Sequence, residues 1–260
     1  MNEKLQKKIS SLAVAKYRQS HGLFVAEGPH VVESFMAIRS AGGGESPDNW
    51  EIESIVYTDR MAQTAAKASK LGIKTEIVDS RAFQKISDTK SPQGILAVIK
   101  IPQNKMSKIR TQDRIIIADG ISDPGNMGTI IRSAAAFGFS GLVTTHGSTD
   151  LFGPKVVRAS QGALAYVTAL NRVPIEQIRE TVEDNYLILA LSAKGKSEIT
   201  GISTGSKRIA LIIGSEIKGI SSELQTLATE QIRIPISNKI ESLNASAAAA
   251  IAMFYLTRQK

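Results

Sequence analysis

The 260-residue chain contains no cysteine. A disulfide framework, a thiol nucleophile and a zinc–thiolate site are therefore all excluded. Long hydrophobic runs are missing too, because the longest, residues 247–256, is far shorter than the ~20 residues that a membrane-spanning helix needs. The N-terminal sequence MNEKLQKKIS lacks the apolar core of a secretory signal peptide. We therefore expect a cytoplasmic protein without a membrane partner.

Several catalytic signatures are also absent. Residues 214–219, GSEIKG, lack the Gly-Lys-Ser/Thr ending of a phosphate-binding P-loop, and no G-x-G-x-x-G follows a predicted strand. The glycine-flanked serine elbow of serine hydrolases is missing as well. The three histidines, His21, His30 and His146, are widely scattered in the sequence. Because the histidines are scattered, we expect no metal site. The missing G-x-G-x-x-G disfavours an ordinary dinucleotide-binding enzyme.

The composition favours a polyanionic partner. Hydrophobic residues make up 42% and charged residues 22% of the chain, as in soluble globular proteins. The net charge is +8, and in the first eighteen residues Glu3 alone opposes a group of basic side chains. Leu5, Ile9 and Leu12 recur there at helical spacing. We predict a basic N-terminal helix, either a solvated surface helix or one that contacts phosphates through Lys4, Lys7, Lys8, Lys16 and Arg18.

Strand-like and helix-like segments alternate along the whole chain, which is typical of an α/β protein. Residues 102–113 are polar without a clear period, so we place a boundary there between a first domain, 1–105, and a second, 106–260. The apolar run RIIIAD at 114–119 indicates a buried parallel strand, and the second domain should hold a parallel sheet with helices on both faces. Ligands would then sit beyond the strand ends, at polar loops 120–127, 192–195, 214–219 and 237–242.

The last thirty residues combine a short strand, a polar loop and an alanine-rich helix. Apolar and other residues alternate over 231–236, which suits a strand. Ser242, Asn244 and Ser246 then offer capping side chains to a helix over 245–256. The small residues of this helix would let another backbone approach closely, and its N-terminus is a natural place to hold a ligand. The alternative is an ordinary capped C-terminal helix.

Three polar loops carry a recognisable set of motifs. They are Asn126-Met-Gly128 with Arg132, then Gly214-Ser-Glu216-Ile-Lys-Gly219, then Ile234-Pro235 followed by Ser242-Leu243-Asn244. In this order they resemble the motifs of the SpoU branch, or TrmH family, of the SPOUT RNA methyltransferases. Those motifs are N-x-G-x-x-x-R, G-x-E-x-x-G, and I-P followed by S-L-N ahead of a small-residue helix. The resemblance covers about residues 115–256.

The N-terminal part resembles the substrate-binding domain of the same family. The matching phrases are Lys16-Tyr-Arg18, Phe24-Val-Ala-Glu-Gly28 and Ser91-Pro-Gln-Gly94. That domain is similar to small ribosomal RNA-binding proteins, in agreement with the basic first helix. The third motif departs from the family, because Ile236 and Asn238 stand where members often have Met and Gly. The resemblance therefore does not fix the shape of that loop.

The resemblance implies a fold and a cofactor. Family members thread the end of the C-terminal sheet into a deep trefoil knot and pair through this domain as homodimers. The knot loops hold S-adenosylmethionine (SAM), so Gly214, Ile234 and Leu243 are implied as cofactor contacts, with Leu191 and Ser192 as further candidates. A side chain at position 214 would fill space that the cofactor needs beside the backbone.

The implied reaction is methyl transfer from SAM to a ribose 2′-hydroxyl of RNA, with ribosomal RNA expected before transfer RNA. Arg132 is implied as a catalytic residue. Because a guanidinium is hard to deprotonate, we expect it to grip the neighbouring phosphate and to steady the developing alkoxide. Asn126, Glu216, Ser242 and Asn244 would orient the ribose and the loops. A non-catalytic RNA-binding protein and an unrelated nucleotide-binding α/β enzyme stay open as alternatives.

Overall fold

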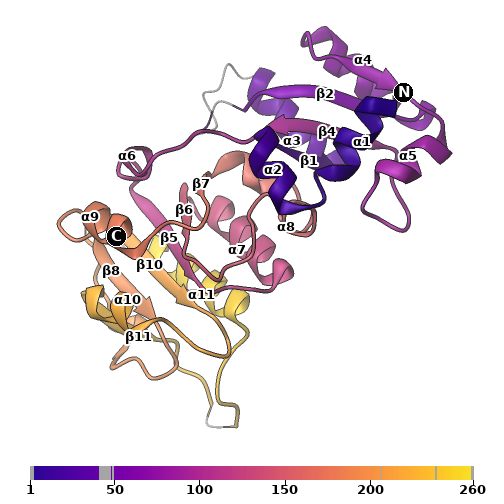
Figure 1. Ribbon diagram of the computed structural model, residues 1–260. Coiled ribbons are helices and arrows are strands. Elements are labelled where there is room, and N and C mark those ends of the chain that lie inside the picture. The colour runs from indigo at the N-terminus through magenta and orange to yellow at the C-terminus, as the bar shows by residue number, and fades with distance from the viewer. Residues whose placement is uncertain (1–2, 41–47, 49, 206, 238, 259–260) are drawn as a thin grey trace. The chain divides into compact units, whose positions relative to one another are not determined.

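The computed structural model describes residues 3–40, 48, 50–205, 207–237 and 239–258. The chain forms two compact units (Figure 1). Unit 1 comprises Met1–Gln103 and Asp150–Tyr166, and unit 2 comprises Asn104–Thr149 and Val167–Lys260. None of the helices in the described ranges combines the length and the apolar character that crossing a bilayer requires.

Unit 1 is built on a four-stranded mixed sheet in the order β1-β4-β2-β3. β4 runs antiparallel to both β1 and β2, whereas β2 and β3 are parallel. The strands are β1 (Leu23–Glu27), β2 (Ile52–Tyr57), β3 (Thr75–Ile77) and β4 (Ile95–Lys100). The helices are α1 (Glu3–Ser11), α2 (Ala15–His21), α3 (Pro29–Ser40), α4 (Ala62–Lys70) and α5 (Ser80–Ile86), with a 3-10 turn at Asp59–Met61.

The basic N-terminal stretch forms two helices, α1 and α2, where a single helix was expected. Ile9 and Leu12 are buried in a cluster with strand residues such as Val25 and Leu96, and Leu5 packs against it. The apolar spacing of this stretch was therefore interpreted correctly, and burial of these side chains is what holds α1 on the sheet. The lysines of α1 are left on its outer side, where Lys4 and Lys7 are exposed.

Residues 150–166 belong to unit 1, although the boundary drawn from the sequence placed them in the second domain, 106–260. This segment carries α8 (Pro154–Ala159) and a 3-10 turn, Ala163–Tyr166. The Phe152 ring centroid lies 5.3 Å from that of Phe24, and the Trp50 indole N–H donates to the Ala165 carbonyl at 2.9 Å. The segment therefore covers an aromatic part of the unit 1 core that would otherwise face water.

Arg18 is an interior residue of unit 1, with 4% of its surface exposed. Its Nη2 and Nε donate to Asp150 Oδ2 at 2.6 and 3.0 Å. Its Nη1 donates to the carbonyls of Leu12 and Ala13 at 2.7 and 2.9 Å. The expectation that Arg18 contacts RNA phosphate is corrected, because its donors are already engaged and shielded from solvent.

Replacing Arg18 by Ala should lower the free energy of unfolding by roughly 3 kcal/mol, because the largely shielded Asp150 carboxylate would lose the cation that it pairs with. Lys16→Ala on the same helix is the matched control, since Lys16 is exposed and its loss should leave stability unchanged. Urea denaturation of the two variants measures the difference. Equal midpoints would show that the buried ion pair contributes nothing to stability.

Unit 2 holds a seven-stranded sheet in the order β7-β6-β5-β10-β8-β11-β9, and every neighbouring pair is parallel. The strands are β5 (Arg114–Asp119), β6 (Gly141–Thr144), β7 (Thr168–Leu170), β8 (Leu187–Leu191), β9 (Ser197–Glu198), β10 (Ile209–Gly214) and β11 (Glu230–Arg233). The helices are α6 (Met106–Ile109), α7 (Pro124–Ala136), α9 (Ile175–Val182), α10 (Ser222–Leu227) and α11 (Ala245–Arg258), with a 3-10 turn at Ile199–Gly201.

Helices cover both faces of this sheet, as the alternating sequence predicted. Ile115 and Ile117 of β5 lie in one buried cluster with Ile178 of α9 and Leu224 of α10. Successive side chains of a strand point to opposite faces, so Ile116 lies on the other face. Figure 1 shows α7 and α11 on that other side, and α11 contacts β10 and β8. Burial on both faces is why these strands are almost continuously apolar.

The strand order places the carboxyl ends of β5, β10, β8 and β11 side by side at one edge of the sheet. β10 enters between β5 and β8, with Gly214 opposite Asp119 and Ile213 opposite Leu191. Ile232 of β11 in turn lies opposite Leu191. Loops that follow these strands therefore meet beside a point where the strand order reverses, which is the usual ligand position in such sheets. The trefoil knot stays a prediction.

Candidate functional site

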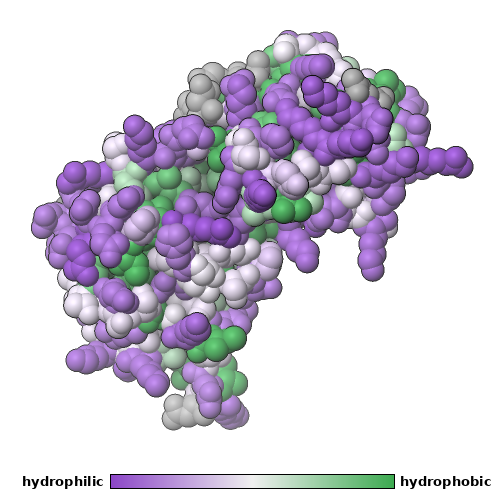
Figure 2. Space-filling model, in the orientation of Figure 1, coloured by the Kyte–Doolittle hydropathy of each residue, from purple (hydrophilic) through white to green (hydrophobic). Residues whose placement is uncertain are grey.

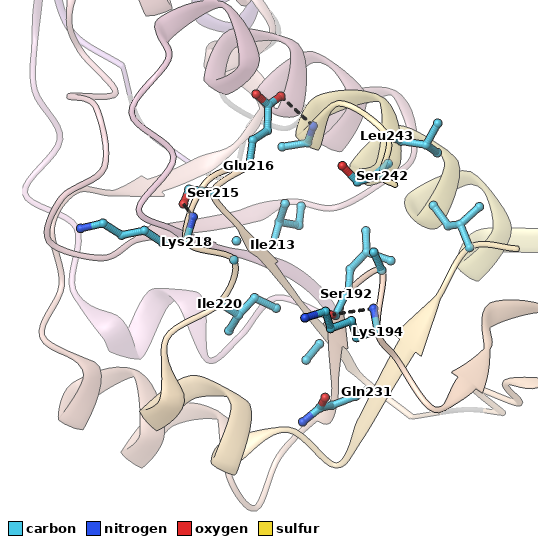
Figure 3. A pocket seen from close by; sticks show the side chains of 18 of the residues that line it. Ser192, Lys194, Ile213, Ser215, Glu216, Lys218, Ile220, Gln231, Ser242 and Leu243 are labelled. Atoms are coloured by element: carbon cyan, nitrogen blue, oxygen red, sulfur yellow. Dashed lines mark hydrogen bonds between the residues drawn. The ribbon is translucent and has the colours of Figure 1, made fainter. Parts of the chain in front are cut away.

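A cavity of about 420 Å³ lies at this edge of unit 2 (Figure 3). The loops after β8, β10 and β11 and the start of α11 line it, and we call it the first cavity. Each of the five predicted cofactor contacts is among its lining residues: Gly214, Ile234, Leu243, Leu191 and Ser192. Ile236 lines it as well, whereas Asn238 lies outside the described residues.

The walls of the first cavity combine aliphatic side chains with backbone groups and a few polar ones. Ile213 and Ile220 flank the turn that follows β10, and Gln231 lies on β11 (Figure 3). The loop after β8 is fixed by a bond from the Ser192 N–H to the Ile232 carbonyl at 2.9 Å. Such a lining suits a flat heteroaromatic ring with a polar tail, and the volume is in the range of small-molecule sites.

Residues 215–219 form a tight turn at the end of β10, which we call the 215–219 turn. Ser215 and Gly219 pair across it, and the Gly219 N–H donates to the Ser215 carbonyl at 2.9 Å. A Cβ at Gly214 would lie 2.3 Å from the carbonyl carbon of Gly219 and 2.4 Å from Ile220 N. The fold of the turn therefore requires glycine at position 214, whether or not a cofactor approaches this backbone.

A second cavity, of about 430 Å³, lies on the other side of the 215–219 turn. Its lining comes from the loop after β5, from His146 and Gly147 after β6, and from the turn. Asp119, at the end of β5, is buried and accepts from Thr145 Oγ1 at 2.6 Å and from the Ser221 N–H at 2.7 Å. This carboxylate joins three loops, a role that the apolar run RIIIAD did not reveal.

The Glu216 carboxylate joins the three sequence motifs. Its Oε1 accepts hydrogen bonds from Asn244 Nδ2 at 2.6 Å, from the Ala245 N–H at 3.1 Å and from Asn126 Nδ2 at 3.2 Å. Asn244 Nδ2 also donates to Asn126 Oδ1 at 2.9 Å. Figure 3 shows Glu216 pointing toward the start of α11. The sequence reasoning grouped these residues, and the structure brings them into direct contact.

Asn244 also caps α11. Its Oδ1 accepts from the backbone N–H groups of Ser246 and Ala247 at 3.0 and 3.2 Å, and from the Ser246 hydroxyl at 2.6 Å. This arrangement satisfies N–H groups that have no partner within the helix. Since α11 has no acidic residue in its first turn, Glu216 supplies from another loop the negative charge that a helix N-terminus favours.

Residues 113–254 match the SpoU rRNA Methylase family, and residues 2–97 match the MRM3-like substrate binding domain. The chain belongs to the SpoU family. It is 28% identical over 246 residues to the 23S rRNA (guanosine(2553)-2′-O)-methyltransferase RlmP of Bacillus subtilis, covering 94% of this chain and 92% of that protein. It is 27% identical to human mitochondrial rRNA methyltransferase 3, covering 94% of this chain and 69% of that protein.

A solved structure shares this fold. The AdoMet-bound rRNA methyltransferase from Sinorhizobium meliloti has a TM-score of 0.83 and 27% identity, with 98% of this chain and 95% of that chain covered. The family assignment confirms the resemblance inferred from the three motifs, and the unit 2 sheet with an N-terminal substrate-binding domain confirms the predicted fold class.

The remaining predicted catalytic residues occupy different places in this SpoU-family chain. Ser242 is exposed and lines the first cavity. Arg132 is exposed on α7 and is not among the lining residues of either cavity. Within the described part of the chain, no acidic side chain forms an ion pair with it at 4 Å or less. In a single chain, the charged side chain of Arg132 is therefore exposed to solvent.

The five basic residues predicted to contact phosphate divide into three kinds. Lys4 and Lys16 are exposed, and Lys7 is exposed with Glu3 as a neighbour at 2.7 Å. Lys8 is half-buried and pairs with Glu53 at 2.7 Å, while Arg18 is buried as described above. Lys4, Lys7 and Lys16 are therefore the most accessible candidates for phosphate contact.

Gly214→Ala should both destabilise the protein and weaken ligand binding in the first cavity, because the added Cβ meets the Gly219–Ile220 backbone. A loss of roughly 1–3 kcal/mol in unfolding free energy is expected, as for other overpacked sites. Gly201→Ala is the control, since its Cβ would meet nothing within 4 Å. Urea melts and calorimetric SAM titration test both effects; unchanged values for Gly214→Ala would contradict the packing argument.

Proposed function

We propose that this SpoU-family enzyme transfers the methyl group of SAM to a ribose 2′-hydroxyl of ribosomal RNA. The observation that carries this proposal is the meeting of three family motifs at Glu216, on a turn with a cavity on each side. The B. subtilis relative is named as a 2′-O-methyltransferase of 23S rRNA, and the S. meliloti structure is described as AdoMet-bound.

The first cavity is the proposed SAM site. Its aliphatic residues would enclose the adenine, while the backbone of Gly214, Leu191 and Leu243 would supply the few hydrogen bonds that orient it. SAM supplies a methyl group on a positively charged sulfur. In the reaction the methyl–sulfur bond breaks, its electron pair stays on sulfur, a methyl–oxygen bond forms, and the hydroxyl proton leaves. The chain's task is to align oxygen, carbon and sulfur, which can account for much of the acceleration.

We infer that the active enzyme is a homodimer formed through α7 and α11. The outer stripe of α7 carries Thr129, Arg132 and Ala136, all exposed. On α11, Ile251 and Phe254 are 43% and 46% exposed, and the Phe254 ring contacts that of Phe137 at 5.7 Å. Apolar side chains of this size at helical spacing favour an interface. A second copy on this stripe would place Arg132 of one subunit beside the site of the other.

Arg132 is then the residue that grips the RNA phosphate and stabilises negative charge on the acceptor oxygen. In such a dimer it acts in the site of the partner subunit, which accounts for its position outside both cavities of its own chain. Unit 1 is the proposed RNA-binding part, with Lys4, Lys7 and Lys16 as phosphate contacts. Cytoplasmic localisation stays part of the proposal.

Arg132→Ala should lower the single-turnover rate of methyl transfer by ~10²–10³ while SAM affinity stays unchanged, because one preorganised charge is lost. The assay uses ribosomal RNA from cells lacking the enzyme and SAM labelled in its methyl group, with ribose methylation mapped in the product. If the unaltered protein leaves the ribose hydroxyls unmethylated, the proposed function is wrong.

Mixing two inactive variants tests the dimer directly. Leu243→Arg should block the first cavity, so neither it nor Arg132→Ala is active alone. When the two are dissociated, mixed equally and reassociated, about half of the dimers contain one of each, and one of their two sites is intact. The expected activity is about a quarter of the unaltered level if Arg132 acts across the interface. No recovery would place Arg132 in its own subunit's site.

A further inference from the structure

Among the large apolar residues that the structure describes, Ile217 is the most exposed, with 95% of its surface accessible to solvent. It stands at the tip of the 215–219 turn, which is held at both ends. Lys218 N–H donates to Ser215 Oγ at 3.1 Å, and Glu216 is fixed by the hydrogen bonds described above. A branched aliphatic group is thus held in water beside both cavities, where a ligand that covered it would gain by removing its apolar surface from water.

The 215–219 turn is the wall between the two cavities. Both cavities are lined by the same set of residues there: Ser215, Glu216, Ile217, Lys218, Gly219 and Ala245. The two reactants of a methyl transfer must approach to about 3–3.5 Å between the reacting atoms. With SAM in the first cavity, the acceptor must reach the same wall from outside, and the second cavity opens there.

We propose that the second cavity receives the acceptor nucleotide of the RNA and that Ile217 packs against the face of its base. This inference rests on the proposed function. An unstacked base has a flat, weakly polar face and polar edges, and RNA is commonly recognised through such splayed-out nucleotides. The second cavity offers matching surfaces, because Ile217 is apolar while Asn126 and His146 can hydrogen-bond to base edges or ribose.

Lys218 is the residue that meets the nucleotide's phosphate. It lines both cavities, and Figure 3 shows its side chain extending away from Ser242 and Leu243, two residues of the third motif that line the first cavity. Asn126 lines the second cavity and is bonded to Glu216, so filling this cavity is coupled to the shape of the turn.

Two pairs of variants test the proposal. Ile217→Ala removes most of the apolar contact and should raise KM for RNA about tenfold, whereas Ile217→Leu should restore it. Ser122→Trp fills the second cavity and should abolish methyl transfer, while Ser122→Ala should not. Ser122 is exposed and lines the second cavity without lining the first, so both Ser122 variants should keep the SAM affinity of the unaltered enzyme.

The measurements are SAM affinity by calorimetry and methyl transfer to ribosomal RNA from cells that lack the enzyme. If the unaltered protein shows no methyl transfer to this RNA, the proposed function itself is wrong. With an active enzyme, normal KM in Ile217→Ala or normal transfer by Ser122→Trp would overturn the nucleotide site. Weakened SAM binding in the Ser122 variants would also overturn it, since the second cavity would then belong to the cofactor.

Discussion

The Glu216 carboxylate accepts hydrogen bonds from Asn126, Asn244 and the Ala245 backbone, at 2.6–3.2 Å. These partners come from α7 and from the start of α11, so one charged group joins the 215–219 turn to two segments that lie far from it in the sequence. Hydrogen bonds to a charged acceptor are stronger than neutral ones. The shapes of both cavities depend on this contact, because the 215–219 turn that carries Glu216 is their common wall.

A second carboxylate, that of Asp119, is buried and supports the same wall. Asp119 ends β5 opposite Gly214 and bonds to Thr145 and to the Ser221 backbone. Gly214 lets the turn fold back on itself without a clash. The parallel register of β5, β10 and β8 thus delivers the loops to one edge, and Asp119 and Glu216 then fix them there. Cofactor and acceptor can be held on opposite sides of a turn only if that turn does not move.

Unit 1 depends on residues 150–166, which the chain inserts between strands β6 and β7. Cutting the chain at the polar stretch 102–113 would therefore leave Phe152 and Asp150 without their partners Phe24 and Arg18. Hydrophilic side chains cover most of the visible face of the molecule, with hydrophobic atoms in separate groups (Figure 2). Exposing the aromatic core of unit 1 would add an apolar surface that the intact chain avoids.

Local signals in the sequence predicted much of this structure. The apolar run at 114–119 is a strand over the same residues, and the capping residue Asn244 marks the start of α11. The motifs grouped Asn126, Glu216 and Asn244 before any contact was known. Each of these features needs only neighbouring residues or a known family pattern.

Features that depend on distant partners could not be predicted in this way. Arg18 resembled its exposed neighbour Lys16 because Asp150, which buries it, is 132 positions away. The two-residue strand β9 has no periodicity to detect. Gly214 was linked to the cofactor, whereas its nearest constraint is the Gly219 backbone, a contact created by the turn. The position of Arg132 outside both cavities likewise follows from tertiary packing.

A double-mutant cycle on Asn126 and Glu216 measures SAM affinity. It tests most directly whether the hydrogen bonds of Glu216 determine the shape of the first cavity. Asn126 does not line the first cavity, so it can affect SAM only through the turn. Asn126→Ala and Glu216→Ala should each weaken SAM binding by about tenfold, as expected for one lost hydrogen bond to a charged group. The double variant should be little weaker than either single one. Losses that multiply, or an unchanged affinity in Asn126→Ala, would contradict the account.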